Sequence, residues 1–223
     1  MNSKYCIIFD CDGVLVDSEP LAALAYQQIY SASGFAIDAS VMQDCIGLKQ
    51  IDIIAKIGSI TGHYLPTEQQ AQIWPTTRKL FEEALKPTQG IKKFLSALKQ
   101  SRCVASSSSL ERISISLNLT GLIDLFKPSI FSSSMVRNGK PAPDLFIFAA
   151  QQMRYSPQNC VVIEDSFLGV QGAVAAGMKA IGFVGGTHSN SQTAQRLLAH
   201  GAAAICSSWW EVSETLSRLG YHD

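Results

Sequence analysis

Four carboxylates follow two short apolar segments of this sequence, in an arrangement suited to binding a divalent cation. Asp10 and Asp12 come after one segment, and Glu164 and Asp165 come after another. Carboxylates gathered in one place repel one another unless a cation lies between them. Hard divalent cations prefer oxygen ligands, so a shared site for these four acids would suit Mg²⁺.

A hydroxyl and a lysine occupy comparable positions. Ser106 follows the apolar residues 103–105, and Lys140 lies in the segment 139–144, Gly-Lys-Pro-Ala-Pro-Asp. A lysine supplies a positive point charge for an anion, and a serine hydroxyl donates a hydrogen bond to one. Taken alone, each would be an ordinary loop residue. The argument that they have a functional role depends on the elements that position them.

Apolar and β-branched runs predict six strands, at 5–9, 103–105, 129–131, 160–163, 179–184 and 202–206. Helical periodicity predicts helices between them, at 91–98, 112–119, 144–153 and 169–177. Alternating strands and helices imply a parallel sheet covered on both faces, which is a Rossmann-like, three-layer α/β/α core. Active groups of such sheets collect at the carboxyl ends of the strands, where the acids and the serine fall, with the lysine in a following loop.

Residues 20–85 differ from the rest, because apolar residues recur there at helical spacing and no strand pattern is present. This segment separates the first predicted strand from the other five. We therefore expect an α/β catalytic core of residues 1–15 and 87–223, interrupted by an all-helical cap domain of residues 16–86.

The composition argues against several classes of protein. Lysines plus arginines number 18, as do aspartates plus glutamates, so the formal net charge of zero gives no field for a nucleic acid or an anionic membrane. No apolar stretch has the length of a membrane span. Zinc-type CxxC spacing is absent, and we expect small buried thiols in a reducing compartment, from the cysteines at 6, 11, 45, 103, 160 and 206. We expect a cytoplasmic monomer or small homo-oligomer.

The motifs resemble those of a known family. The segment 10–19, Asp-Cys-Asp-Gly-Val-Leu-Val-Asp-Ser-Glu, looks like the first motif of the haloacid dehalogenase superfamily in its phosphatase form. Ser106, Lys140 and the pair Glu164-Asp165 resemble the second, third and fourth motifs, in the same order. The resemblance covers essentially the whole chain and is strongest to the branch of sugar-phosphate phosphatases and β-phosphoglucomutase.

The resemblance implies a mechanism. Asp10 would attack phosphorus and form a covalent aspartyl-phosphate, which divides a slow hydrolysis into two easier displacements. Asp12 would protonate the leaving alcohol and later deprotonate the attacking water. Mg²⁺ would be held by Asp10, Glu164 and Asp165, and by the backbone carbonyl of Asp12.

The resemblance also implies how the phosphoryl group is held. Lys140 would supply a positive charge to Asp10 and the phosphoryl group, and Ser106 would donate a hydrogen bond to the latter. The strand register leaves Ser107 as a second phosphate-binding candidate. Gly13 is another phosphate-binding candidate and would allow the sharp backbone turn after the two acids.

The cap is expected to select the substrate, a small phosphorylated metabolite such as a sugar, sugar-acid or sugar-alcohol phosphate. The candidate residues for this selection lie in one loop, at Gly47, Leu48, Lys49 and Gln50. A cationic Lys49 would favour a substrate that carries an acidic group or a second phosphate.

A β-phosphoglucomutase-like sugar-phosphate mutase is the alternative function. Many relatives of that kind have a histidine where this chain has Ala22, and an arginine after the Gly47 loop where it has Lys49 and Gln50. Without groups to hold a second phosphate in the cap, hydrolysis is favoured. Asp12 argues against a dehalogenase, in which no leaving alcohol needs a proton. A non-enzymatic binding module would have lost a catalytic group, and none is missing.

Simpler explanations exist for single motifs. Asp-Cys-Asp-Gly alone would be an ordinary acidic turn, and Glu164-Asp165 alone would cap a helix. Four motifs in the right order argue against both. The remaining candidate groups are expected to be structural: Cys11 packs away from the acids, Trp209 and Trp210 pack in the core or at an edge, and four scattered histidines lie on the surface or in loops, at 63, 188, 200 and 222.

Overall fold

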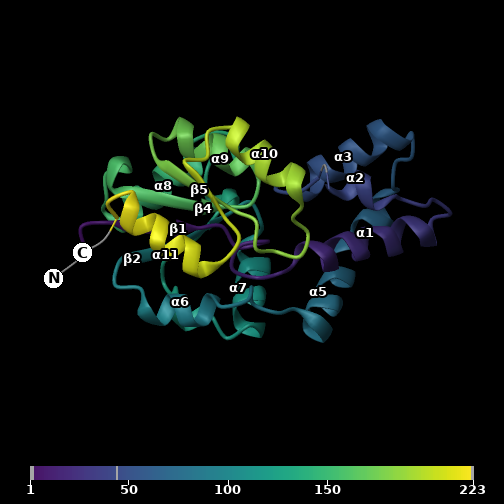
Figure 1. Cartoon of the computed structure of the whole chain (residues 1–223). Coiled ribbons are helices and arrows are strands. Elements are labelled where there is room, and N and C mark those ends of the chain that lie inside the picture. The colour runs from purple at the N-terminus through teal and green to yellow at the C-terminus, as the bar shows by residue number, and fades with distance from the viewer. Residues whose placement is uncertain (1–2, 44, 222–223) are drawn as a thin grey trace.

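The computed structural model describes residues 3–43 and 45–221, and this part of the chain contains one parallel six-stranded sheet (Figure 1). The strands are β1 (Cys6–Phe9), β2 (Ser101–Ser106), β3 (Ile130–Ser132), β4 (Cys160–Glu164), β5 (Lys179–Phe183) and β6 (Ala204–Cys206). Their order is β3-β2-β1-β4-β5-β6, with every neighbouring pair parallel. The α/β fold class and all six predicted strands are confirmed.

The strand order reverses between β1 and β4, because the chain builds outward from β1 in one direction and from β4 in the other. Parallel sheets bind ligands at the carboxyl edge beside such a reversal. The register pairs Phe9 with Ile163, so the residues that follow, Asp10 and Glu164, emerge side by side.

Helices cover both faces of the sheet. This is expected because successive strand residues point to opposite faces and both faces are apolar. Ile7 and Phe9 of β1 pack into one hydrophobic core, and Cys6 and Ile8 pack into the other. The first core is closed by α6 (Ile91–Ala97), α7 (Leu110–Leu119) and α11 (Trp209–Arg218), and the second by α8 (Asp144–Met153), α9 (Phe167–Ala175) and α10 (Ser191–Ala199). Short 3₁₀ turns complete the core, at η1 (Ile123–Leu125), η2 (Ser133–Met135) and η3 (Pro157–Asn159).

Two of these helices, α10 and α11, were not predicted from the sequence. Both begin at a clear N-cap: the side chain of Asn190 accepts hydrogen bonds from two backbone N–H groups of α10, and that of Ser208 accepts one from the N–H of Glu211. Trp209, at the start of α11, is buried against Phe9, Phe94 and Phe183, which confirms its predicted packing role. Trp210 is 71% exposed, so the same prediction was wrong for this residue.

The segment between β1 and β2 contains none of the sheet's strands. Its described residues form five helices before α6. They are α1 (Glu19–Ala32), α2 (Ala39–Gln43), α3 (Gln50–Thr61), α4 (Thr67–Gln70) and α5 (Ile73–Ala84). Four of these helices, α1, α2, α3 and α5, share a separate hydrophobic cluster that includes Tyr26, Tyr30 and Ile57. Figure 1 shows α1, α2 and α3 together at one end of the molecule. A helical cap region is therefore present, while the domain boundaries at 16 and 86 remain a prediction.

Two chain segments connect the sheet to the helical region, and they lie side by side. Val16 pairs with Pro87 in an antiparallel bridge, and the hydroxyl of Thr88 donates a 2.6 Å hydrogen bond to the carbonyl of Val14. The indole of Trp209 in turn donates to the Thr88 hydroxyl at 3.0 Å. These hydrogen bonds fix both connecting segments to the core close to Asp10 and Asp12, the acids that follow β1. None of the helices in the described residues combines the length and apolar character of a membrane span.

Candidate active site

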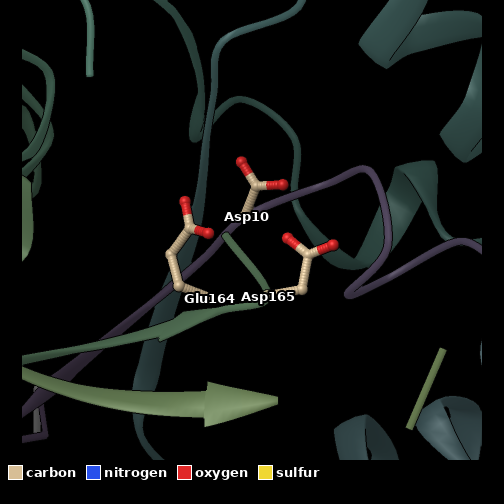
Figure 2. A group of neighbouring side chains, drawn as sticks. All are labelled: Asp10, Glu164 and Asp165. Atoms are coloured by element: carbon tan, nitrogen blue, oxygen red, sulfur yellow. The ribbon is translucent and has the colours of Figure 1, made fainter. Parts of the chain in front are cut away.

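The predicted acids meet at the carboxyl edge of the sheet. The carboxylates of Asp10, Glu164 and Asp165 are turned toward one shared space (Figure 2), and their nearest oxygens all lie within 4.8 Å of one another. All three are buried, with exposed fractions of 6%, 0% and 4%. Such a concentration of negative charge away from water is costly without a cation. The cluster is consistent with a metal site, while Mg²⁺ itself remains a prediction.

Lys140 supplies part of that compensating charge. Its Nζ donates to Oδ1 of Asp10 at 2.6 Å, to Oε1 of Glu164 at 2.5 Å and to the carbonyl of Ala105 at 3.0 Å. Its side chain is 1% exposed. Burial opposes its charge, but Asp10 and Glu164 outweigh burial and hold the pKa of Lys140 above its usual range. The lysine predicted from the third motif therefore bridges the acids of the first and fourth.

The two acids of the fourth motif differ in how they are held. Oε2 of Glu164 accepts hydrogen bonds from the backbone N–H and the hydroxyl of Ser166, both at 2.9 Å. With Oε1 bound to Lys140, both oxygens of Glu164 have partners. Oδ2 of Asp165 is buried and accepts no well-aligned hydrogen bond from the described residues, although Nε2 of His188 lies 3.0 Å away. A buried carboxylate oxygen without a hydrogen bond is a fitting ligand for a hard cation.

Asp12 lies in a different environment from Asp10. It accepts hydrogen bonds from the hydroxyl of Ser18 at 2.7 Å, the hydroxyl of Ser108 at 2.6 Å and Nη2 of Arg112 at 2.8 Å. Burial alone would raise the pKa of Asp12, but the Arg112 charge and the two hydroxyls outweigh burial, so this pKa is lowered. Asp12 is held as a carboxylate.

The pKa of Asp10 shifts in the opposite direction. Burial raises it, and Glu164, Asp165 and Asp12 raise it further, with Lys140 opposing them. Burial and the neighbouring acids thus disfavour a charge on Asp10, which is a further reason to expect a cation beside it.

The predicted serines lie at the end of β2. Ser106 is 1% exposed, and its hydroxyl accepts a hydrogen bond from the N–H of Ser108 at 3.2 Å. The carbonyl of Ser107 accepts from the hydroxyl of Ser133 at 2.8 Å. Both predicted serines line the same cavity as Asp10, so either has access to a bound ligand there.

A cavity of about 370 Å³ opens beside the acids and extends into the helical region. Its walls come from the carboxyl edge of the sheet and from α1, α2 and α3. The polar and charged lining consists of Asp10, Asp12, Glu19, Gln27, Gln43, Ser106, Ser107, Ser108, Arg112, Lys140, Glu164, Asp165, Ser166, Thr187 and His188. The apolar lining is mostly from the helical region and includes Ala22, Tyr26 and Ile53.

The predicted cap residues divide between two cavities. Gly47 and Leu48 line the large cavity, and Gly47, at φ +80°, lies so close to Ser166 that a Cβ there would be 2.6 Å from the Ser166 Cβ. Lys49 and Gln50 line a neighbouring cavity of about 150 Å³. Gln50 donates to the carbonyl of Gln70 at 3.2 Å. The proposed selectivity of these four residues remains a prediction.

Gly13 shows why the first motif ends in glycine. Its φ is +74°, and a Cβ there would lie 1.9 Å from Oδ2 of Asp165 and 2.9 Å from Cε1 of His188. Any side chain would therefore push Asp165 away. The predicted turn is confirmed, and the close approach to Asp165 is an additional reason for it.

His188 lies in the loop after β5, as predicted for a surface or loop residue, but its side chain is buried within the candidate site. Its side chain is 6% exposed and its Nε2 lies 3.0 Å from Oδ2 of Asp165. Burial disfavours the charged imidazole, but Asp165 outweighs burial and raises the pKa of His188 to about 9. His63 is exposed and His200 half-buried, and His222 lies outside the described residues. All six cysteines are free and buried as predicted, and Cys11 packs in the core.

Sequence reasoning also missed Ser18, Ser108 and Arg112. Arg112 was placed at the start of a helix, whereas α7 begins at Leu110 with Ser109 as its N-cap. This start puts Arg112 in the first turn, near the strand end that carries Ser106. A serine run followed by a basic residue in the first helical turn was the available signal.

Comparisons with known proteins agree with this geometry. Residues 7–183 match the model of the haloacid dehalogenase-like hydrolase family. The chain is 29% identical over 191 residues to a 6-phosphogluconate phosphatase of Escherichia coli (strain K12), covering 85% of this chain and 86% of that protein. It is 29% identical over 187 residues to a β-phosphoglucomutase of Bacillus subtilis (strain 168), covering 79% and 81%.

A solved structure is similar over almost the entire chain. It is a haloacid dehalogenase-like protein of unknown function from Agrobacterium tumefaciens str. C58, with a TM-score of 0.85 and 34% identity, covering 96% of this chain and 98% of that one. The family match over residues 7–183 is consistent with the six-stranded sheet, its helical cap region and the buried acidic cluster. This chain belongs to the haloacid dehalogenase-like hydrolase family.

Proposed function

We propose that this protein is a Mg²⁺-dependent phosphatase that hydrolyses a small phosphomonoester through an aspartyl-phosphate on Asp10. The observation that carries the proposal is the position of Asp10, whose carboxylate is bound by Lys140 at 2.6 Å, clustered with Glu164 and Asp165, and open to the large cavity. A nucleophile, a fixed cation and a candidate metal site thus share one space.

The first step transfers the phosphoryl group to the protein. A carboxylate oxygen of Asp10 forms a bond to phosphorus while the bond from phosphorus to the ester oxygen breaks. The free site holds Asp12 as a carboxylate, so Asp12 must take up a proton when the phosphate binds; it then gives this proton to the departing oxygen, which leaves as an alcohol. Lys140 holds Asp10 and offers its charge to the phosphoryl oxygens, and Ser106 is placed to donate its hydroxyl to them.

The second step restores Asp10. Water attacks the phosphorus of the aspartyl-phosphate, Asp12 accepts a proton from that water, and the acyl-phosphate bond breaks to release inorganic phosphate. The lowered pKa of Asp12 supports this basic role, because the carboxylate is the form that accepts a proton. Asp12 returns to the protonated form that the next turnover requires.

Asp10, Asp165 and the backbone carbonyl of Asp12 would hold Mg²⁺, with Glu164 positioning Lys140 beside them or joining the ligands. When bound, the ion would neutralise phosphoryl charge and lower the repulsion between phosphate and Asp10. The buried Oδ2 of Asp165, which has His188 beside it but accepts no hydrogen bond from the described residues, supports this assignment.

A sugar phosphate, or a sugar-acid or sugar-alcohol phosphate, is the proposed substrate class. The relative from E. coli is named for 6-phosphogluconate, and the cavity of about 370 Å³ is of the size that accommodates a small organic phosphate. The similarity to a β-phosphoglucomutase keeps a mutase as the alternative. Ala22, which lines the cavity, offers no acid, base or hydrogen-bond donor to a turning sugar, so hydrolysis is favoured.

Phosphate release from a panel of sugar, sugar-acid, sugar-alcohol and nucleotide monophosphates, with Mg²⁺, tests this proposal. We expect turnover of one substrate group, lost in Asp10→Asn and after addition of a chelator, and kept in the control Asp124→Asn, which changes an exposed aspartate. An isomerised sugar phosphate without phosphate release would instead establish the mutase.

A further inference from the structure

Arg112 reaches the site from the first turn of α7. Its Nη2 lies 2.8 Å from Oδ1 of Asp12, and its side chain is 21% exposed. The residue lines both the large cavity and the neighbouring cavity of about 150 Å³. A positive charge therefore stands where the two cavities meet, beside the acid proposed to protonate the leaving alcohol.

The guanidinium has donors that the protein does not use. A guanidinium carries five N–H groups, and the structure gives this one a single hydrogen bond, to Asp12. Its Nε is buried and meets no acceptor in the described part of the chain. Leaving a buried donor unpaired costs about 1–3 kcal/mol, so such a group is suited to a ligand that supplies the acceptor.

Phe81 of α5 supports the guanidinium from the helical region. The Arg112 Cζ lies 5.2 Å from the centroid of the Phe81 ring, and Phe81 is 1% exposed. A cation that rests on a fixed aromatic face keeps its orientation. The unused donors are thus held in place rather than free to turn toward water.

The other cations that line the large cavity already have partners. Lys140 is bound to Asp10, Glu164 and the carbonyl of Ala105, and His188 lies against Asp165 with its Nδ1 unpaired. Among the described lining cations, Arg112 and His188 thus have a donor left for a ligand, and Arg112 is the one of the two that contacts Asp12. Glu19 also lines this cavity, but burial and the nearby charges of Asp12 and Asp165 raise its pKa to about 7, which weakens its repulsion of an anion near neutral pH.

We propose that Arg112 is a specificity residue that binds a second anionic group of the substrate, a carboxylate or a second phosphate, on the leaving-alcohol side of the reacting phosphate. The preferred substrates are then phosphorylated sugar acids or sugar bisphosphates rather than phosphates of neutral sugars. A planar guanidinium matches both groups because each presents two oxygens to its fork. This inference rests on the proposed phosphatase function.

The test uses three substrates of equal carbon number: an alditol phosphate, the corresponding aldonic acid phosphate and the alditol bisphosphate. The kcat and KM of each are measured for the wild type, Arg112→Gln and Arg112→Lys, with Arg78→Gln as a surface control. Any effect of Arg112 through Asp12 is common to the three substrates and cancels in the ratio of two kcat/KM values.

We expect Arg112→Gln to lower kcat/KM for an anionic substrate by about 10- to 100-fold more than for the alditol phosphate, mainly through KM. Arg112→Lys should restore part of the preference, since it keeps the charge but loses the fork. A preference restricted to the aldonic acid phosphate identifies a carboxylate, and one restricted to the bisphosphate identifies a phosphate.

Equal losses on all three substrates would overturn the inference and leave Arg112 a positioning residue for Asp12. Wild-type turnover of the alditol phosphate at least as fast as that of both anionic substrates would also overturn it. Both results leave the phosphatase function standing. Absence of phosphate release from every substrate by a folded wild-type protein would instead contradict the proposed function.

Discussion

The Nζ of Lys140 lies 2.6 Å from Oδ1 of Asp10 and also donates to Glu164, so one buried ammonium joins the first and fourth motifs. Lys140 follows Asp10 by 130 residues in the sequence and lies in the loop before α8, the helix that packs on β1 and β2. The packing of α8 on the sheet therefore sets the spacing of the proposed nucleophile and its cation, while the pairing of β1 with β4 sets that of Asp10 and Glu164. Several consequences of this arrangement are open to measurement.

Removing one hydroxyl from Asp12 should shift the pH dependence of turnover. The Ser108 hydroxyl donates to Oδ2 of Asp12 at 2.6 Å and helps to lower its pKa, so Ser108→Ala should raise that pKa. With p-nitrophenyl phosphate, whose leaving group needs no proton, Asp12 acts mainly as a base. The acidic limb of the kcat profile should then move to higher pH.

The control is Ser96→Ala, which removes an exposed hydroxyl on α6. Its acidic limb should coincide with that of the wild type. An unchanged limb in Ser108→Ala would mean that Asp12 is not the base whose ionisation limits turnover.

Gly13→Ala should weaken metal activation. Both Gly13 and Gly177 have φ +74°, but a Cβ at Gly13 would lie 1.9 Å from Oδ2 of Asp165, whereas a Cβ at Gly177 would meet nothing within 4 Å. Each substitution costs about 1–2 kcal/mol of backbone strain, so the difference between them isolates the displacement of Asp165.

We expect Gly13→Ala to raise the Mg²⁺ concentration for half-maximal activity by about 10- to 100-fold relative to Gly177→Ala. Both are measured by metal titration of phosphate release, with folding checked by circular dichroism. Equal metal requirements in the two variants would show that the approach of Gly13 to Asp165 is unimportant for the metal.

The positions of the residues at the strand ends could be predicted, because two simple physical rules determine these positions. An apolar run predicts a buried strand, and neighbouring parallel strands bring their carboxyl ends to one edge. The pairing of Phe9 with Ile163 then places Asp10 beside Glu164. Gly13 was predictable in the same way, since the turn after Asp12 requires a positive φ.

The contacts of Asp12 could not be predicted, because they depend on how separate elements pack. Arg112 lies 100 residues from Asp12 in the sequence and reaches it only through the position of α7 on the sheet. His188 approaches Asp165 from the loop after β5, and no other candidate ligand lies at a metal-ligand spacing from it in the sequence. The starts of α10 and α11 were readable at their N-caps, Asn190 and Ser208, and α11 also carries an apolar stripe of Trp209, Val212 and Leu216, so this helix could have been predicted.

The two adjacent tryptophans should differ sharply in their effects on stability. Trp209 is buried among Phe9, Phe94 and Phe183, so Trp209→Ala should lower the free energy of unfolding by about 3–5 kcal/mol. Trp210 is 71% exposed, so Trp210→Ala should change it by no more than about 0.5 kcal/mol. Urea unfolding followed by circular dichroism measures both. Similar losses in the two variants would contradict the core position of Trp209.

His188 should make the stability of the metal-free protein depend on pH. Its pKa rises from 6.5 to about 9 on folding, because Asp165 favours the charged imidazole. A raised pKa stabilises the folded state fully below the unfolded value, and this contribution is lost as the pH rises through the folded value.

The difference in free energy of unfolding between the wild type and His188→Gln should therefore be largest below pH 6.5 and shrink toward pH 9. Chemical unfolding with a chelator present, at several pH values, measures it. His63→Gln, at an exposed histidine, is the control for losing an imidazole. A difference that stays constant across this range would contradict the ion pair with Asp165.

The central claim is that Asp10 carries the phosphoryl group. Asp12→Asn removes the base that activates water, and p-nitrophenyl phosphate supplies a leaving group that needs no acid. This variant should therefore complete the first step and stop before the second. Rapid mixing with Mg²⁺ measures the release of p-nitrophenol, and peptide mass spectrometry of the quenched protein locates any phosphoryl group.

We predict a burst of p-nitrophenol equal to the protein concentration, a phosphoryl group on the peptide that contains Asp10, and neither signal when Asp10→Asn is added to Asp12→Asn. A burst that persists in the double variant, or a phosphoryl group found on another residue, would contradict the account.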